Sequence, residues 1–128
     1  MYQLLTSIYG KECVFRNYID SRYPFHCDFY ISNIDTFIEL NIHWTHGGHW
    51  YNPSNKNDID MLCEWQNKQQ TKPSYKTAIE TWSIRDVHKK NIAEQNHINY
   101  IVLWNRKDIE NFELKLLSNK GDRLNENL

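Results

Sequence analysis

Apolar and polar residues alternate in three consecutive stretches near the start of the chain. Residues 12–18 alternate loosely, and residues 25–31 and 36–42 are rich in aromatic and β-branched side chains on either side of a Ser-Asn-Ile-Asp turn. Alternation bounded by turn residues is typical of paired β-strands. Residues 1–9 instead place apolar side chains at helical spacing and stop at Gly10, a residue type that commonly ends helices. The pattern predicts a helix followed by a three-stranded meander.

The second half of the chain mixes helical and extended patterns after a loop rich in Gly, Asn and Ser. We expect the following elements in order: a helix capped by Asn57 and Asp58, a strand over residues 79–84, a helix opened by Asp86, a buried strand over residues 97–104 and a helix over residues 108–117. A carboxylate at a helix start suits both the free amides and the helix dipole, and a run that is apolar nearly throughout is typical of a buried strand. The predicted fold class is α/β, an αβββαβ core with a mixed sheet flanked by helices.

Length and composition favour one folded domain. The chain has 128 residues, of which 40% are hydrophobic and 14% aromatic, enough for one core but not for two. We expect residues 1–118 to form this domain and residues 119–128 to be a polar tail that frays. Cys13, Cys27 and Cys63 are scattered and odd in number, as in proteins with reduced thiols. With no signal peptide or membrane span in the sequence, we predict a cytoplasmic protein without membrane contact.

Two acidic residues lie within strongly apolar strand patterns. Asp28 is in an aromatic run, and Glu39 is flanked by isoleucine and leucine. Charged groups among apolar neighbours are costly unless they are paired or bound to metal, although both could instead point to the solvent face of an alternating strand. Two carboxylates on adjacent strands can converge on Mg²⁺ or Mn²⁺, which prefer oxygen ligands. The pair therefore indicates a hydrolytic metal site.

Three histidines recur at intervals of three residues in the following loop: His43, His46 and His49. A zinc site is one interpretation, but the spacing matches no common zinc finger and no cysteine is near. Two other interpretations are that the rings only form hydrogen bonds, or that one imidazole transfers protons beside a metal-bound phosphate. Gly47 and Gly48 allow positive φ or a close approach of the backbone, which favours a functional loop with His46 as its active member.

Asp86 and its neighbours complete the candidate set. Its helix start would lie at a sheet edge, where sites in α/β folds gather, although an aspartate at a helix start is often only structural. The net charge is −1, so a nucleic acid would need a local basic face. Arg85, Lys89 and Lys90 are the candidates for phosphate contacts, although runs of charge are usually solvated.

Several of these segments together resemble a known nuclease family. They are Tyr-Pro-Phe-x-Cys-Asp-Phe-Tyr-Ile, Phe-Ile-Glu-Leu-Asn, Trp-Thr-His-Gly-Gly-His, the Arg-Asp pair at 85–86 and Ile-Asn-Tyr at 98–100. Over residues 10–105 the chain resembles phage-type nuclease domains similar to the very-short-patch-repair endonucleases of the PD-(D/E)xK superfamily. The resemblance implies a restriction-endonuclease-like αβββαβ core and a metal-dependent DNA phosphodiesterase, in the host cytoplasm if a phage encodes it.

The resemblance also assigns roles to individual residues. It implies that Asp28, Glu39 and Asp86 are metal ligands for Mg²⁺ (or Mn²⁺), and that His46 is the catalytic histidine. Asn41 occupies the place of the lysine in the (D/E)xK motif, so His46 or Lys90 would have to replace that lysine. The implied catalytic set is Asp28, Glu39, Asn41, His46 and Asp86, and the expected DNA contacts are Arg85, Lys89, Lys90 and His49.

Three functions remain open from the sequence. The leading hypothesis is a magnesium-dependent deoxyribonuclease that nicks or cleaves DNA. The absent lysine and a first helix without acids favour an alternative, a catalytically lapsed DNA-binding or inhibitor module on a nuclease fold. A zinc protein that uses the three loop histidines is the third and weakest hypothesis.

Overall fold

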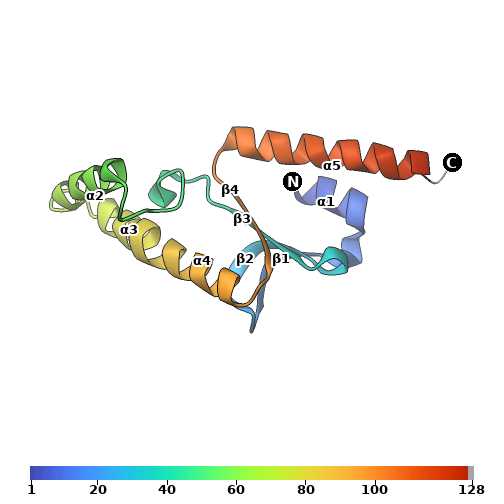
Figure 1. Cartoon of the computed structure of the whole chain (residues 1–128), viewed down its shortest axis with the longest axis horizontal. Helices are drawn as coiled ribbons and strands as arrows, with labels where there is room; N and C mark the ends of the chain where they lie inside the picture. Colours follow the sequence, from blue (N-terminus) through green and yellow to red (C-terminus); the bar gives the residue numbers. More distant parts are fainter. Residues whose placement is uncertain (127–128) are drawn as a thin grey trace.

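A four-stranded sheet lies at the centre of the molecule (Figure 1). The computed structural model describes the backbone of residues 1–126 and the side chains of residues 1–119. The first three strands pair antiparallel and the fourth lies parallel to the third, so the sheet is mixed, as predicted. The strands, in both chain and spatial order, are β1 (Val14–Asp20), β2 (Tyr23–Ile31), β3 (Thr36–Leu40) and β4 (Asn99–Leu103).

Helices cover both faces of this sheet. In Figure 1 the first and last helices lie together on one side, and a long helical segment crosses the other side. This arrangement confirms the predicted α/β class. The longer helices are α1 (Tyr2–Tyr9), α2 (Lys56–Lys68), α3 (Ser74–Glu80), α4 (Asp86–Gln95) and α5 (Arg106–Glu126). The short helical turns are η1 (Lys11–Cys13), η2 (Ser32–Ile34), η3 (Trp44–His46) and the π-helical η4 (Thr81–Arg85).

The two faces of the sheet have separate apolar cores. Successive strand residues point to opposite faces, so Ile38 joins the core under α1 and α5 while Phe37 joins the core under α4. A third cluster lies away from the sheet, where α2 packs beside α3, and is built on Trp65, Ala78 and Trp82. This third cluster anchors the loop that carries the histidines.

The predicted strand over residues 79–84 is wrong, because these residues are helical. The segments α3, η4 and α4 follow one another without a break. Short apolar runs are ambiguous between helix and strand, and here the helical spacing over a longer stretch of the chain decides the structure. The buried positions of this long helical segment recur at intervals of three and four, at Ala78, Trp82, Asp86, Lys89 and Ala93. All of the connection from β3 to β4 that forms regular structure is therefore helical.

Two predicted helix starts are also corrected. Asp86 does not open a helix, since Arg85 before it already has helical backbone angles and the helical segment continues through both. For α2, the capping side chain is Asn55, whose Oδ1 accepts hydrogen bonds from the amides of Asn57 and Asp58 at 2.9 and 3.3 Å. Asp58 is instead 3% exposed and bonds to the preceding loop. A carboxylate at either position could have capped a helix, but both carboxylates instead form hydrogen bonds to the loop after β3.

Strand β4 is an edge strand and not the fully buried strand that its apolar sequence predicted. It ends the sheet next to β3, and only Leu103 among its residues is buried. Its side chains contact helices on both faces of the sheet, which explains the continuous apolar run. The free edge leaves Tyr100 and Val102 accessible from one side.

The last helix extends beyond the predicted boundary at Leu117. Helix α5 continues to Glu126, and residues 127–128 of the predicted polar tail lie outside the described residues. Although α5 is the longest helix, neither it nor any other helix in the described part of the chain is long and apolar enough to cross a membrane.

Candidate active site

A polar cavity of about 230 Å³ opens where β2 and β3 meet the histidine-bearing loop and the middle of the long helical segment. All five predicted catalytic residues contribute to its wall, although they come from four separate parts of the chain. The lining residues are His26, Asp28, Glu39, Leu40, Asn41, His46, Thr81, Arg85, Asp86 and Lys89. The fold thus gathers the candidate residues into one site, which we call the polar cavity.

Asp28 and Glu39 reach the polar cavity from paired strands. Phe29 pairs with Ile38 in the antiparallel register, so one further step sets Asp28 opposite Glu39, where both side chains share a face. Asp28 is exposed, and its Oδ2 accepts a hydrogen bond from the Leu40 amide at 2.7 Å. Among the described residues this is the only hydrogen bond to that carboxylate. Asp28 therefore keeps acceptor capacity for a ligand.

Glu39 is buried and surrounded by hydrogen-bond donors. Its Oε2 accepts from the hydroxyl of Tyr23 at 2.6 Å and from Lys89 Nζ at 3.3 Å, and the Tyr100 hydroxyl lies 3.5 Å away. The carboxylate is only 4% exposed, and the paired ammonium group compensates the cost of burying its charge. Burial, together with the charges of neighbours that include Glu39, raises the pKa of both tyrosines. The tyrosines therefore remain neutral donors.

Asp86 and His46 form a closely bonded pair. His46 Nδ1 and Asp86 Oδ2 are 2.7 Å apart, and the aspartate side chain is 1% exposed while the imidazole is 20% exposed. A carboxylate at Nδ1 favours the tautomer with the proton on that nitrogen, which leaves Nε2 as the acceptor. The pair thus has the composition of an oriented proton acceptor at the wall of the polar cavity.

The loop around His46 is fastened to the π-helical turn η4 through Trp82. Gly47 has φ of +72°, and a Cβ atom at this position would lie 2.4 Å from the Trp82 indole. The indole Nε1 donates a hydrogen bond to the carbonyl of His49 at 2.8 Å. Glycine is required here both by the positive φ and by the close approach of the ring. These contacts fix the loop against the helix that supplies Asp86.

Lys89 occupies a position that the sequence did not assign to it. The side chain is buried in the polar cavity against Glu39, whereas it was expected to contact DNA phosphate. Lys90, predicted as an alternative to His46 in replacing the absent lysine, lies elsewhere, with its ammonium over the Trp50 ring. The signal that could have found Lys89 is the helical spacing that continues from Ala78 and Trp82 through Asp86, which the predicted strand over residues 79–84 concealed.

The remaining predicted residues have varied positions. Asn41 is 5% exposed, lines the polar cavity and donates its backbone amide to the Leu103 carbonyl at 2.8 Å. Arg85 is exposed at the cavity wall. His49 lies outside this lining and contacts Asp58 Oδ1 through Nε2 at 2.7 Å. Only Arg85 of the predicted DNA contacts is therefore both exposed and part of the polar cavity.

The three loop histidines bond to three different partners: Thr45 for His43, Asp86 for His46 and Asp58 for His49. In the part of the chain that the structure describes, no three His, Cys, Asp or Glu side chains are close enough to hold a metal ion together. Neither the histidine trio nor the three predicted carboxylates form such a group. A cation in the polar cavity would rely on fewer protein ligands, with Asp28 as the most accessible oxygen donor.

Comparisons of the chain with protein-family models, with curated proteins and with solved structures found no match. The chemistry of the polar cavity is therefore argued from its own residues.

Proposed function

We propose that this protein is a metal-dependent deoxyribonuclease that hydrolyses phosphodiester bonds in the polar cavity. The observation that carries the proposal is the meeting of Asp28, Glu39, the Asp86–His46 pair and Lys89 in one cavity. Acidic oxygens suit a hard cation, an oriented imidazole suits proton transfer, and an ammonium group suits developing negative charge.

The arrangement of the elements supports the same proposal. Helix α1, the β1–β3 meander, a helical connection and a fourth strand parallel to β3 follow the αβββαβ order of the restriction-endonuclease-like core. Asp28 and Glu39 lie on the second and third strands, as the resemblance to very-short-patch-repair endonucleases leads us to expect. We therefore assign the chain to that fold as part of the proposal.

The donor set fits one divalent cation such as Mg²⁺ or Mn²⁺, held by Asp28 and Glu39. Both carboxylates supply the oxygen ligands that these ions prefer, and Asp28 accepts only one hydrogen bond from the described residues. A bound cation neutralises phosphate charge and lowers the pKa of a bound water. Asp86, which was predicted as a third ligand, is bonded to His46 and is better suited to orienting that ring.

The remaining groups of the polar cavity divide the other tasks. His46 Nε2 accepts a proton from the attacking water, because Nδ1 is engaged by Asp86. Lys89 takes the role of the lysine that Asn41 replaces in the sequence motif: it approaches Glu39 from the helix instead of from the strand. Arg85, exposed at the wall, is placed to bind a phosphate of the substrate.

A plasmid assay tests the proposal. We expect the wild-type protein to convert supercoiled DNA to nicked or linear forms with Mg²⁺ or Mn²⁺, and to lose this activity in EDTA. Asp28→Ala abolishes cleavage because it removes the accessible metal ligand, whereas the matched control Asp60→Ala, an exposed acid on α2, leaves it unchanged. Circular dichroism checks that both variants fold. Absence of cleavage by wild type on duplex, nicked and single-stranded DNA with either metal refutes the proposal.

A catalytically lapsed module is the second candidate, favoured by one specific observation. The Oε2 atom of Glu39 already accepts hydrogen bonds from Tyr23 and Lys89, with the Tyr100 hydroxyl 3.5 Å away, without any cation. Calorimetry with Mn²⁺ separates the two functions: an active nuclease shows metal binding that Asp28→Ala removes. A lapsed module shows no such binding but still binds DNA.

A further inference from the structure

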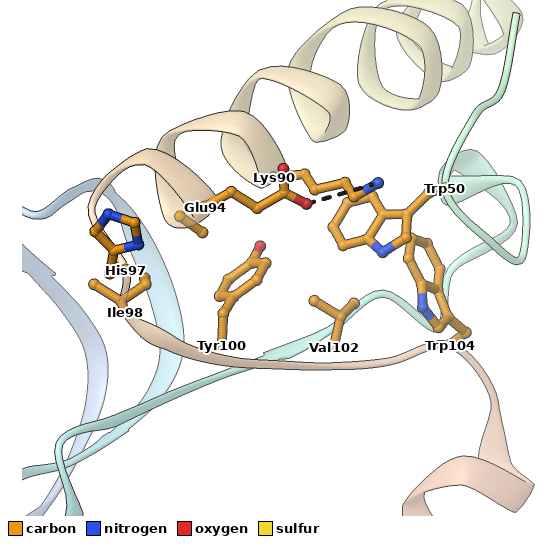
Figure 2. Close-up of a pocket in the computed structure, with 9 residues that line it drawn as sticks. Trp50, Lys90, Glu94, His97, Ile98, Tyr100, Val102 and Trp104 are labelled. Atoms are coloured by element: carbon orange, nitrogen blue, oxygen red, sulfur yellow. Dashed lines mark ion pairs between the residues drawn. The ribbon is translucent and has the colours of Figure 1, made fainter.

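A second cavity lies beside the polar cavity, between α4 and the edge strand β4 (Figure 2). Its volume is about 330 Å³, near the lower end of the range of about 300–1,000 Å³ for small-molecule sites. Figure 2 shows Tyr100 and Val102 pointing from the strand toward the helix, with Trp50 and Trp104 together at one end. We call this cavity the aromatic pocket.

Aromatic rings form a corner in the aromatic pocket. The indoles of Trp50 and Trp104 are 4.8 Å apart between centroids and nearly perpendicular, at 86°. The Trp50 and Tyr100 rings are closer to parallel, at 27°, with centroids 6.3 Å apart. All three rings line the pocket and are only partly buried, although aromatic residues of this size usually bury their surface in a core. The corner offers a planar ligand one ring to stack on and another to contact with its edge.

Charged and polar groups surround these rings. Lys90 Nζ lies 5.7 Å from the centre of the Trp50 ring and 3.9 Å from Glu94 Oε1, as Figure 2 shows. His97 lies at the other end of the aromatic pocket, near the start of β4. A lysine beside an aromatic ring can bind a phosphate while the ring stacks on the attached base. Glu94 and His97 can form hydrogen bonds with the polar edge of such a base.

We infer that the aromatic pocket binds an unpaired nucleobase of single-stranded DNA, an inference that rests on the proposed nuclease function and specifies its substrate. A nucleobase is planar, has polar edges and is attached to phosphates, so it matches the rings, the polar groups and Lys90 together. A base within an intact duplex is stacked on both sides and cannot enter a closed corner of this kind.

The two cavities border the same helix and are linked through Tyr100, which places a bound strand near the polar cavity. The ring of Tyr100 lines the aromatic pocket, and its hydroxyl lies 3.5 Å from Glu39 Oε2. On α4 the consecutive residues Lys89 and Lys90 contribute to the polar cavity and the aromatic pocket, respectively. A strand whose base stacks on Trp50 would therefore lie beside the helix and the tyrosine that border the polar cavity.

Binding to metal-free protein tests this inference separately from cleavage. In EDTA, fluorescence anisotropy with a labelled single-stranded oligonucleotide should show binding that is about 5- to 150-fold weaker for Trp50→Ala, as expected for losing one base–aromatic stack. Trp50→Phe retains a ring and should bind close to wild type. Trp44→Ala removes a tryptophan outside the aromatic pocket and serves as the matched control. Equal affinities of wild type and Trp50→Ala overturn the inference.

Photo-crosslinking uses the wild-type protein, so its result does not depend on whether a variant folds. Single-stranded DNA containing 5-bromodeoxyuridine should crosslink to Trp50, Trp104 or Tyr100, identified by peptide mass spectrometry. A crosslink to duplex DNA with one base opposite an abasic site identifies an extruded base as a further source of the ligand. Crosslinks only to residues outside the pocket overturn the inference. Binding that depends on Trp50 without any cleavage supports base binding in the aromatic pocket and refutes the nuclease function. Cleavage without Trp50-dependent binding supports the nuclease function and refutes base binding in the pocket.

Discussion

The loop after β3 supplies two histidines, and each forms a similar pair with an aspartate of a helix, Asp86 of α4 or Asp58 of α2. His46 bonds to Asp86 and His49 bonds to Asp58, each at 2.7 Å, and both carboxylates are buried. The two histidines differ in exposure, at 20% for His46 and 56% for His49. They also differ in the nitrogen that is engaged, Nδ1 for His46 and Nε2 for His49. The bond itself does not distinguish a reactive pair from a structural one.

The neighbours of each pair make the difference. The second carboxylate oxygen of Asp58 accepts a hydrogen bond from the backbone amide of Asn52 at 2.9 Å, so this aspartate connects the loop to the start of α2. Asp86 and His46 instead line the polar cavity with Asp28 and Lys89. An imidazole can take part in hydrolysis only where a phosphate and a water can reach it. The neighbouring carboxylate and ammonium groups, more than an Asp–His contact or the exposure of the ring, therefore identify the candidate catalytic pair.

Removal of each imidazole tests most directly whether the two histidines differ in function. We expect His46→Ala to lower the rate of plasmid cleavage by about 10²–10⁴-fold, the usual contribution of a general base. His49→Ala should leave the rate near that of wild type, because His49 does not line the polar cavity. Rates measured at saturating Mg²⁺ check the prediction. Equal losses in the two variants would show that the pairs are not functionally distinct.

Gly47 and Gly48 lie between the two histidines and provide a matched test of how the loop is held. Both have positive φ, but a Cβ on Gly47 would lie 2.4 Å from Trp82 while nothing lies within 4 Å of one on Gly48. We expect Gly47→Ala to lower the free energy of unfolding by about 2–5 kcal/mol, from backbone strain plus overpacking. Gly48→Ala should lower it by only about 1–2 kcal/mol, from strain alone. Urea unfolding followed by circular dichroism measures both, and equal values contradict the close packing on Trp82.

Replacing each of the two aspartates should give opposite outcomes for stability and cleavage. Asp58→Ala leaves the Asn52 amide and the His49 ring without their acceptor, so the free energy of unfolding should fall by about 1–3 kcal/mol while cleavage persists. Asp86→Ala should instead remove most of the cleavage, since it releases the ring of His46. Thermal unfolding and plasmid cleavage are measured on both variants. Loss of cleavage in a folded Asp58→Ala protein would mean that this pair also serves the reaction.

The strands and the acids on them could be predicted from the sequence because their signals are local. Alternation of apolar residues located β2 and β3 to within two residues at each end, and with them Asp28 and Glu39 on neighbouring strands. The end of α1 at Gly10 was also correct, since its φ of +95° is one that glycine adopts readily. Each of these features depends on residues adjacent in the chain.

The helical side of the site could not be predicted from such local signals. Residues 79–84 alternate like a strand, but Trp82 packs at helical spacing with Ala78 against α2 and the loop. The predicted break at Asp86 then hid the continuity that places Lys89 next to Glu39. Tertiary packing outweighed a weak periodic preference over a short window.

The sequence alone was enough to predict the α/β class, the three-stranded meander and a set of acids and histidines as candidate site residues. Only the tertiary structure decided which of them meet: His46 joins Asp86, and His49 joins Asp58 instead. It also decided that Lys89, and not Lys90, approaches Glu39. The physical reason is that the sequence gives the type of each side chain directly, whereas its neighbours in space depend on how a helix packs across a sheet. One residue along that helix turns the side chain by about 100°, enough to move an ammonium group from one cavity to the other.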